Sequence, residues 1–127
     1  MPHLNETVYF IVNPVAGNEA SLKIWKKAEE ILKSKAVPHE VFFTREKGHA
    51  LRLTKEILSG TNQDTRVIAV GGDGTINEMI NGAIGFPHAI IGSLAAGSGN
   101  DYVRGIQKTE SMEEALSLFQ DNALEYH

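Results

Sequence analysis

One short stretch of the sequence, residues 67–78 (VIAVGGDGTINE), constrains the fold more than any other. Its first four residues are apolar and mostly β-branched, which predicts a strand buried on both faces, as in a parallel sheet. Beyond the glycines, an apolar stripe at helical spacing predicts a helix, with Ile76, Met79, Ile80 and Ala83 on one face. The glycines therefore lie in a strand-to-helix turn that needs backbone conformations forbidden to side chains. Free N–H groups and the positive end of the helix dipole would make this turn an anion site. The alternative is a tight turn that needs glycine only for its shape.

The rest of the chain repeats the alternation of short apolar runs and amphipathic stretches. The predicted strands are residues 8–12, 41–43, 67–70 and 89–92, with the start of a fifth at 123–126. Besides the helix around residues 76–83, the predicted helices are 19–35 with Asn18 as N-cap, 49–58, 100–104 and 111–119. Trp25 is expected to anchor the core. Strands that alternate with helices predict an α/β fold, a three-layer domain with a parallel sheet between helices.

Composition narrows the class of protein. The chain has 127 residues, which suits one domain, and its lack of cysteine excludes disulfides and Cys-ligated zinc. A net charge of −4 argues against a nucleic-acid partner bound through its phosphates. No apolar run approaches the ~20 residues of a membrane span, and the first residues lack the pattern of a signal peptide. We therefore expect a soluble, cytoplasmic protein.

The unusual segments of the chain all follow predicted strands. They are residues 13–17, Thr44, 71–78 and 97–101. In a parallel sheet the ligand site lies beyond the carboxyl ends of the strands, so we expect these segments to line one cleft that suits phosphate. The P-loop signature is absent, because no Gly-Lys-Ser/Thr follows a glycine at the required spacing. The dinucleotide fingerprint is absent as well, because Asn77 stands where it needs its third glycine.

Asp73 is the unexpected residue of the glycine turn. A carboxylate among phosphate-binding amides repels an anion unless a cation intervenes or the carboxylate takes part in proton transfer. Both conditions are met in Mg²⁺-dependent phosphoryl transfer. The alternative is that Asp73 caps the following helix. Thr75, Glu78 and Gly82 share a side of that helix, which either meets a ribose or the neighbouring loop, or is solvated.

The basic residues show no pattern of their own. His39, His49 and His88 lack the spacing of metal ligands, and we expect them at the surface or in loops. Arg45 directly follows Thr44 and is either solvated or close to a phosphate.

Four motifs occur together in this chain. They are Asn13-Pro14-x-x-Gly17, Thr44 with Gly48-His49-Ala50, Gly71-Gly72-Asp73-Gly74-Thr75-x-Asn77-Glu78, and Gly97-Ser98-Gly99-Asn100-Asp101. In this order they resemble the diacylglycerol kinase catalytic domain family, which includes bacterial lipid kinases and the sphingosine kinases. The Gly-Gly-Asp-Gly-Thr element alone is shared with NAD kinases and, more loosely, with phosphofructokinases. The first and last motifs favour the lipid kinases.

The resemblance implies a nucleotide-binding domain with a phosphofructokinase/NAD kinase-like fold, ATP as phosphoryl donor and Mg²⁺ as cofactor. The residues that it places around ATP are Asn13, Pro14, Val15, Ala16, Gly17, Thr44, Gly71, Gly72, Asp73, Gly74, Thr75, Ile76, Asn77, Glu78, Gly97, Ser98, Gly99 and Asn100. The family usually has threonine in place of Ser98, and serine keeps the hydroxyl. Asp73 is the base in some branches of the family, whereas bacterial lipid kinases place a base in the following domain.

Length is the main departure from the family. Family members continue into a β-rich domain that binds the lipid, whereas this chain ends at His127. We therefore expect the ATP-binding domain of a longer enzyme that phosphorylates a lipid hydroxyl, with diacylglycerol or a related glycerolipid as acceptor. The whole enzyme would contact a membrane peripherally, and the domain alone would be nearly inactive. An NAD kinase and a non-catalytic nucleotide-binding regulatory module are the alternatives, and the oligomeric state stays open.

Overall fold

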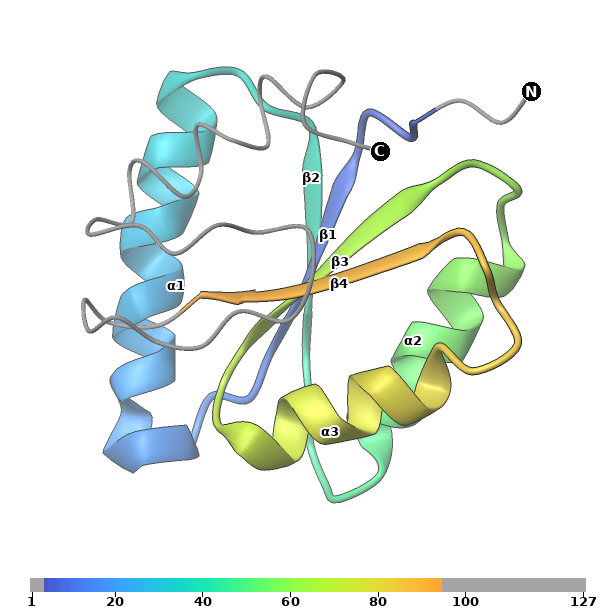
Figure 1. Ribbon diagram of the computed structural model, residues 1–127. Coiled ribbons are helices and arrows are strands. Elements are labelled where there is room, and N and C mark those ends of the chain that lie inside the picture. Colours follow the sequence, from blue (N-terminus) through green and yellow to red (C-terminus); the bar gives the residue numbers. More distant parts are fainter. Residues whose placement is uncertain (1–3, 95–127) are drawn as a thin grey trace.

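Strands and helices alternate along the chain in the computed structural model, which describes residues 4–94 (Figure 1). The elements are β1 (Val8–Val12), α1 (Ala16–Ser34), β2 (His39–Phe43), α2 (His49–Ser59), β3 (Thr65–Val70), α3 (Asp73–Gly82) and β4 (Ala89–Leu94). All four strands predicted in this range are present, three of them with two further residues at one end. The predicted helices 100–104 and 111–119, the strand 123–126 and the segment 97–101 lie outside the described residues.

The strands form one parallel sheet in the order β2-β1-β3-β4. Val12 pairs with Phe43 on one side and with Val70 on the other, and Val70 pairs in turn with Leu94. The carboxyl ends of the four strands therefore lie in one row. Every residue of β3 is buried, as predicted for a strand covered on both faces.

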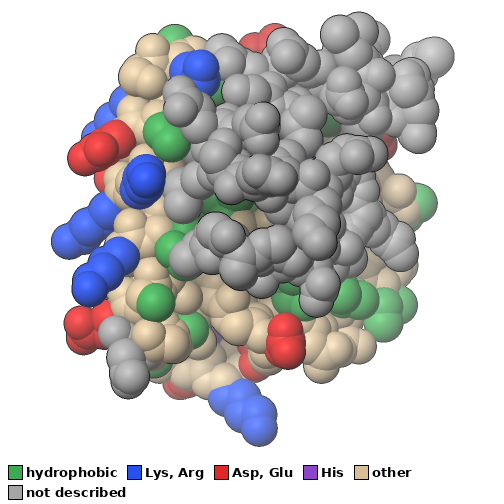
Figure 2. All heavy atoms as spheres, turned by 60° about the vertical axis from the view of Figure 1, so that its left-hand side comes forward, with side chains coloured by type: hydrophobic (Ala, Val, Ile, Leu, Met, Phe, Trp, Pro, Cys, Tyr) green, Lys and Arg blue, Asp and Glu red, His purple; other side chains and the backbone are tan. Residues whose placement is uncertain are grey.

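Helices cover both faces of the sheet, so the predicted three-layer α/β fold is confirmed. Helix α1 lies on one face, and α2 and α3 lie on the other (Figure 1). Trp25 of α1 is 2% exposed and packs against Phe10 of β1, with ring centroids 5.0 Å apart, which confirms its place in the core. On the opposite face, Ile11 of β1 shares a core cluster with Leu58 of α2 and Met79 of α3. The outer face of α1 carries exposed lysines and glutamates, seen as blue and red side chains in Figure 2.

Helix α1 begins earlier than predicted. Its N-cap is Val15, so the assignment of that role to Asn18 is wrong. The cause is a turn at Asn13, which accepts a hydrogen bond from Val15 N through its side-chain Oδ1 (3.2 Å) and one from Ala16 N through its carbonyl (3.2 Å). Such side-chain-to-backbone bonds are typical of turns at asparagine. They start the helical turn directly behind β1.

Helix α3 presents a different face to the core than its apolar stripe predicted. Met79 is buried, but Ile80 is 40% exposed, whereas Thr75 and Gly82 are buried. The reason is the close approach of α2. A Cβ on Gly82 would lie 2.6 Å from the carbonyl oxygen of Leu51, so only a residue without a side chain fits there. Small residues of α3 therefore face α2, and part of its apolar stripe lies outside.

No helix in residues 4–94 is long and apolar enough to cross a membrane.

Candidate functional site

A cleft of about 440 Å³ lies beyond the carboxyl ends of β1, β2 and β3. Its walls are formed by Asn13, Pro14, Val15, Ala16, Thr44, Arg45, Glu46, Lys47, Ala50, Gly72, Gly74, Thr75 and Glu78. Three of the four segments that the sequence predicted to share a site thus come together here. The fourth segment, residues 97–101 with Gly97, Ser98, Gly99 and Asn100, lies outside the described residues.

The wall after β1 is held to the sheet by Asn13. Its backbone N–H donates to the carbonyl of Val70 (2.9 Å), which joins the end of β1 to the end of β3. Its side chain organises the turn into α1, as described above. Pro14, Val15 and Ala16 follow in that turn and line the cleft, whereas Gly17 does not. Gly17 has a φ of 62°, a left-handed conformation that favours glycine.

The wall after β3 contains the glycines, and they are needed for space rather than for backbone conformation. Neither Gly71, Gly72 nor Gly74 has a positive φ, so the expectation that this turn requires conformations forbidden to side chains is wrong. A Cβ on Gly71 would lie 2.7 Å from Thr75 Oγ1 and 3.2 Å from Asn13 Cβ. A Cβ on Gly72 or Gly74 would meet nothing within 4 Å, and both residues line the cleft. Gly71 thus permits close packing, and the other two place bare backbone at the cleft wall.

Asp73 is the first residue of α3 and is exposed between the two glycines that line the cleft. The N-cap of the helix is Gly72, and within residues 4–94 the Asp73 carboxylate has no hydrogen-bond or ion-pair partner. The structure therefore offers no support for Asp73 as a helix cap. The first backbone N–H groups of a helix lack intrahelical acceptors, so the carboxylate lies beside donors that suit an anion.

Of the other predicted residues of α3, Ile76 and Asn77 do not line the cleft. Ile76 packs against the core cluster shared by the sheet, α2 and α3. Asn77 is exposed, and its carbonyl accepts a hydrogen bond from Asn81 Nδ2 (2.9 Å). Glu78 does line the cleft, but its carboxylate is engaged with the neighbouring loop, which is one of the two roles proposed for its side of the helix.

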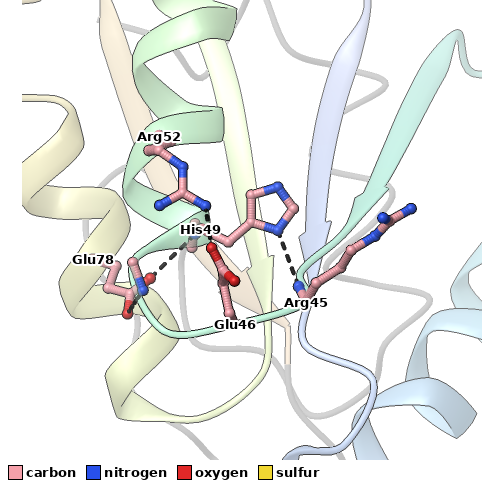
Figure 3. A network of polar contacts seen from close by, with 7 residues as sticks. Arg45, Glu46, His49, Arg52 and Glu78 are labelled. Carbon is pink, nitrogen blue, oxygen red and sulfur yellow. Dashed lines mark hydrogen bonds and ion pairs between the residues drawn. The ribbon is translucent and has the colours of Figure 1, made fainter.

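The wall after β2 is the loop of residues 44–48. Thr44 N donates to the carbonyl of Val12 (2.9 Å), so the loop starts beside β1. Arg45 N donates to Nδ1 of His49 (3.0 Å), which requires that this nitrogen carries no proton (Figure 3). Glu46 forms an ion pair with Arg52 at 2.8 Å (Figure 3). The loop is thus ordered by contacts with the first turn of α2.

The charge of the cleft wall favours an anion. Of its two glutamates, Glu46 is paired with Arg52 and Glu78 accepts backbone hydrogen bonds. Arg45 and Lys47 are exposed and have no ion-pair partner in the described part of the chain. Arg45 and Lys47 are therefore the charged side chains of this wall that no other described group engages, and Asp73 adds one carboxylate at the start of α3.

Glu46, Lys47 and Ala50 were not predicted as site residues. They belong to the segment after β2, so the rule that placed Thr44 at the site would have included them. No group of three or more metal-ligating side chains occurs among residues 4–94. His39 and His88 bind backbone carbonyls instead, those of Val37 and Leu58 (2.8 Å each).

Comparisons with known proteins agree with this arrangement. The sequence profile of the family "Diacylglycerol kinase catalytic domain" matches residues 7–126. The protein named "Putative lipid kinase YtlR" of Bacillus subtilis (strain 168) is 36% identical over 111 residues, which cover 84% of this chain and 35% of that protein. Sphingosine kinase B of Dictyostelium discoideum is 27% identical over 123 residues, which cover 90% of this chain and 16% of that protein.

Solved structures show the same fold. The "Crystal structure of a putative diacylglycerol kinase from Bacillus anthracis str. Sterne" matches with a TM-score of 0.70 and 27% identity, over 92% of this chain and 40% of that one. The chain spans about a third of the length of its Bacillus subtilis relative. Sequence profile, relatives and fold agree, and the chain belongs to the diacylglycerol kinase catalytic domain family.

Proposed function

We propose that this chain is the ATP-binding domain of a lipid kinase, an enzyme that transfers the γ-phosphoryl group of ATP to a lipid hydroxyl. One observation carries the proposal. The strand-end segments that bear the motifs after β1, β2 and β3 meet in a single cleft whose uncompensated side chains in the loop after β2 are cations. Membership of a family whose named relatives are lipid kinases supports the chemistry.

The residues of the cleft suit the triphosphate of ATP. Arg45 and Lys47 supply positive charge, and the start of α3 supplies backbone N–H groups beside Gly72 and Gly74. Both kinds of donor stabilise a phosphate without base-specific contacts. We assign the triphosphate to this part of the cleft.

Asp73 is suited to Mg²⁺. This ion is usually held by one or two carboxylates together with substrate phosphates and water, so a carboxylate that has no partner among residues 4–94 and lies beside a phosphate site fits it. When bound, the ion neutralises charge that develops on the transferred phosphoryl group. We propose that Asp73 either orients this ion or accepts the proton of the acceptor hydroxyl, and that it acts in chemistry rather than as a cap.

The acceptor is proposed to be diacylglycerol or a related glycerolipid. It would bind to a part of the enzyme that corresponds to the portion of the relatives that this chain does not match. Because the acceptor is a membrane lipid, the whole enzyme would work at the membrane surface from the cytoplasm. We propose no nucleic-acid partner.

A phosphoryl-transfer assay tests the proposal. The complete gene product is incubated with Mg²⁺, ATP labelled in its γ-phosphate, NAD, and vesicles that contain diacylglycerol or sphingosine. We expect label in a lipid. Label in NAD and in no lipid would identify an NAD kinase, and ATP binding without any transfer would identify a regulatory module.

A further inference from the structure

We propose that Glu78 is a positioning residue of the ATP cleft, because its carboxylate holds the loop of residues 44–48 against α3. The inference rests on the proposed function, since it concerns the same cleft. It assigns to Glu78 an indirect role: Glu78 acts on ATP through the loop that it binds and touches neither phosphate nor metal.

Both carboxylate oxygens of Glu78 are engaged by the start of α2. The backbone N–H of Gly48 donates to Oε2 at 2.8 Å, and that of Ala50 donates to Oε1 at 3.1 Å (Figure 3). Glu78 is only partly exposed to solvent. These two hydrogen bonds orient the carboxylate toward the start of α2. This geometry separates Glu78 from Asp73, whose carboxylate has no partner within residues 4–94.

Helix α2 depends on this contact for its capping. Its N-cap is Gly48, with a φ of 88°, and the helix has no side-chain cap of its own and no acidic residue in its first turn. The first N–H groups of a helix have no intrahelical acceptors, and its N-terminus favours negative charge. Glu78 supplies both an acceptor and a charge from another helix, 28 and 30 residues along the chain.

The contact joins two walls of the cleft. Arg45 and Lys47 belong to the wall formed by the loop, and Thr75, one turn before Glu78, belongs to the wall formed by α3. The other side-chain hydrogen bonds of the loop join it to the first turn of α2. The side chain of His49 accepts one from the backbone of the loop, and Arg52 donates one to Glu46. In the described part of the chain, Glu78 is therefore the side chain that hydrogen-bonds this loop to a different element. It sets the distance between the loop cations and the glycine turn.

The substitution Glu78→Gln tests this role with little change in volume. The amide keeps one acceptor oxygen, but its NH₂ group faces a backbone N–H, so one of the two hydrogen bonds is lost. The loop is then released on one side, and its cations no longer hold their distance from the start of α3. We expect the Kd for Mg²⁺-ATP of the 127-residue chain to rise about tenfold.

His88 offers a matched control, because it binds the C-terminal end of α2, whereas Glu78 binds the N-terminal end. Its Nε2 donates to the carbonyl of Leu58 (2.8 Å), and the residue does not line the cleft. The substitution His88→Phe keeps a ring and removes this hydrogen bond. Both variants lose one bond to α2 and should lower the Tm by a similar few degrees, but only Glu78→Gln should weaken ATP binding. If Glu78→Gln fails to fold, Glu78→Asp, which keeps the charge on a shorter side chain, should raise the Kd by a smaller factor than the one expected for Glu78→Gln.

The outcomes separate the two proposals. A wild-type chain that binds no ATP would overturn the proposed function, and this inference with it. A wild-type chain that binds ATP, with a Kd left unchanged by Glu78→Gln or Glu78→Asp, would overturn the inference alone. An equal loss of affinity in His88→Phe would also overturn it, because general loosening of α2 would then explain the effect.

Discussion

Gly71 shows at the scale of a single residue why the turn after β3 is rich in glycine. Its backbone does not require glycine, but the space does, because a Cβ would lie 2.7 Å from Thr75 Oγ1 and 3.2 Å from Asn13 Cβ. We predict that Gly71→Ala lowers the free energy of unfolding by about 1–3 kcal/mol, the usual cost of overpacking. Thermal or denaturant unfolding of the chain measures it. Gly74→Ala is the control, since a Cβ there meets nothing within 4 Å, and equal stability of the two variants would refute the packing argument.

Asp73 is predicted to matter for phosphoryl transfer and not for stability. Its carboxylate is exposed and has no partner in the described part of the chain, so Asp73→Asn should change stability only through the helix dipole, by less than about 1 kcal/mol. We expect the complete enzyme to lose turnover and to keep ATP binding. The measurement is phosphoryl transfer beside nucleotide titration and thermal unfolding. Turnover that survives the substitution would leave Asp73 without a chemical role.

The sequence predicted much of the site, and the residue roles that it did not predict depend on contacts formed only in the folded chain. The rule that ligands bind beyond the carboxyl ends of parallel strands placed Asn13, Thr44 and Thr75 at one cleft, and they do line it. The capping of α2 by Glu78 joins residues 28 and 30 positions apart, and no local pattern encodes such a contact. The reason for Gly71 lies equally in neighbours that only the folded chain brings together.

The packing of α2 against α3 gives a prediction at the scale of elements. A Cβ on Gly82 would lie 2.6 Å from the carbonyl oxygen of Leu51 and 3.0 Å from the Cβ of Thr54. Alanine is normally preferred to glycine in a helix by about 1 kcal/mol, yet we predict that Gly82→Ala lowers the free energy of unfolding by roughly 1–3 kcal/mol. Denaturant unfolding measures it. Gly74→Ala in the same helix should be at least as stable as the wild type, and a stabilised Gly82→Ala variant would show that the helices are not in close contact.

Elements were predicted more reliably in existence than in detail. Short β-branched runs such as residues 67–70 identify buried strands because no other element of that length is so apolar. The start of α1 was predicted too late in the chain. The side chain of Asn13 forms a turn that places the N-cap at Val15, ahead of Asn18, the predicted N-cap. The buried face of α3 was misjudged because hydrophobicity alone ranks Ile80 above Gly82, whereas the approach of α2 favours the smaller residue.

For the whole molecule, the order β2-β1-β3-β4 explains the position of the cleft. The chain moves from β1 outward to β2 and then crosses to β3 and β4 on the other side, so the order reverses between β1 and β3. Loops that follow neighbouring strands diverge at such a reversal and leave a crevice. The cleft is lined by the segments after both of these strands. The alternation of strands and helices predicted the parallel sheet, but a single sequence does not state the strand order.

Binding of Mg²⁺-ATP, followed by NMR, tests whether the three strand-end segments form the nucleotide site. The nucleotide is titrated into the nitrogen-labelled chain, and the backbone amide shifts are mapped onto the fold. We predict that the largest changes fall in residues 13–16, 44–47 and 72–75, the three segments that line the cleft. An absence of changes, or changes confined to the opposite end of the sheet around His88 and Thr65, would rule out this cleft as the ATP site.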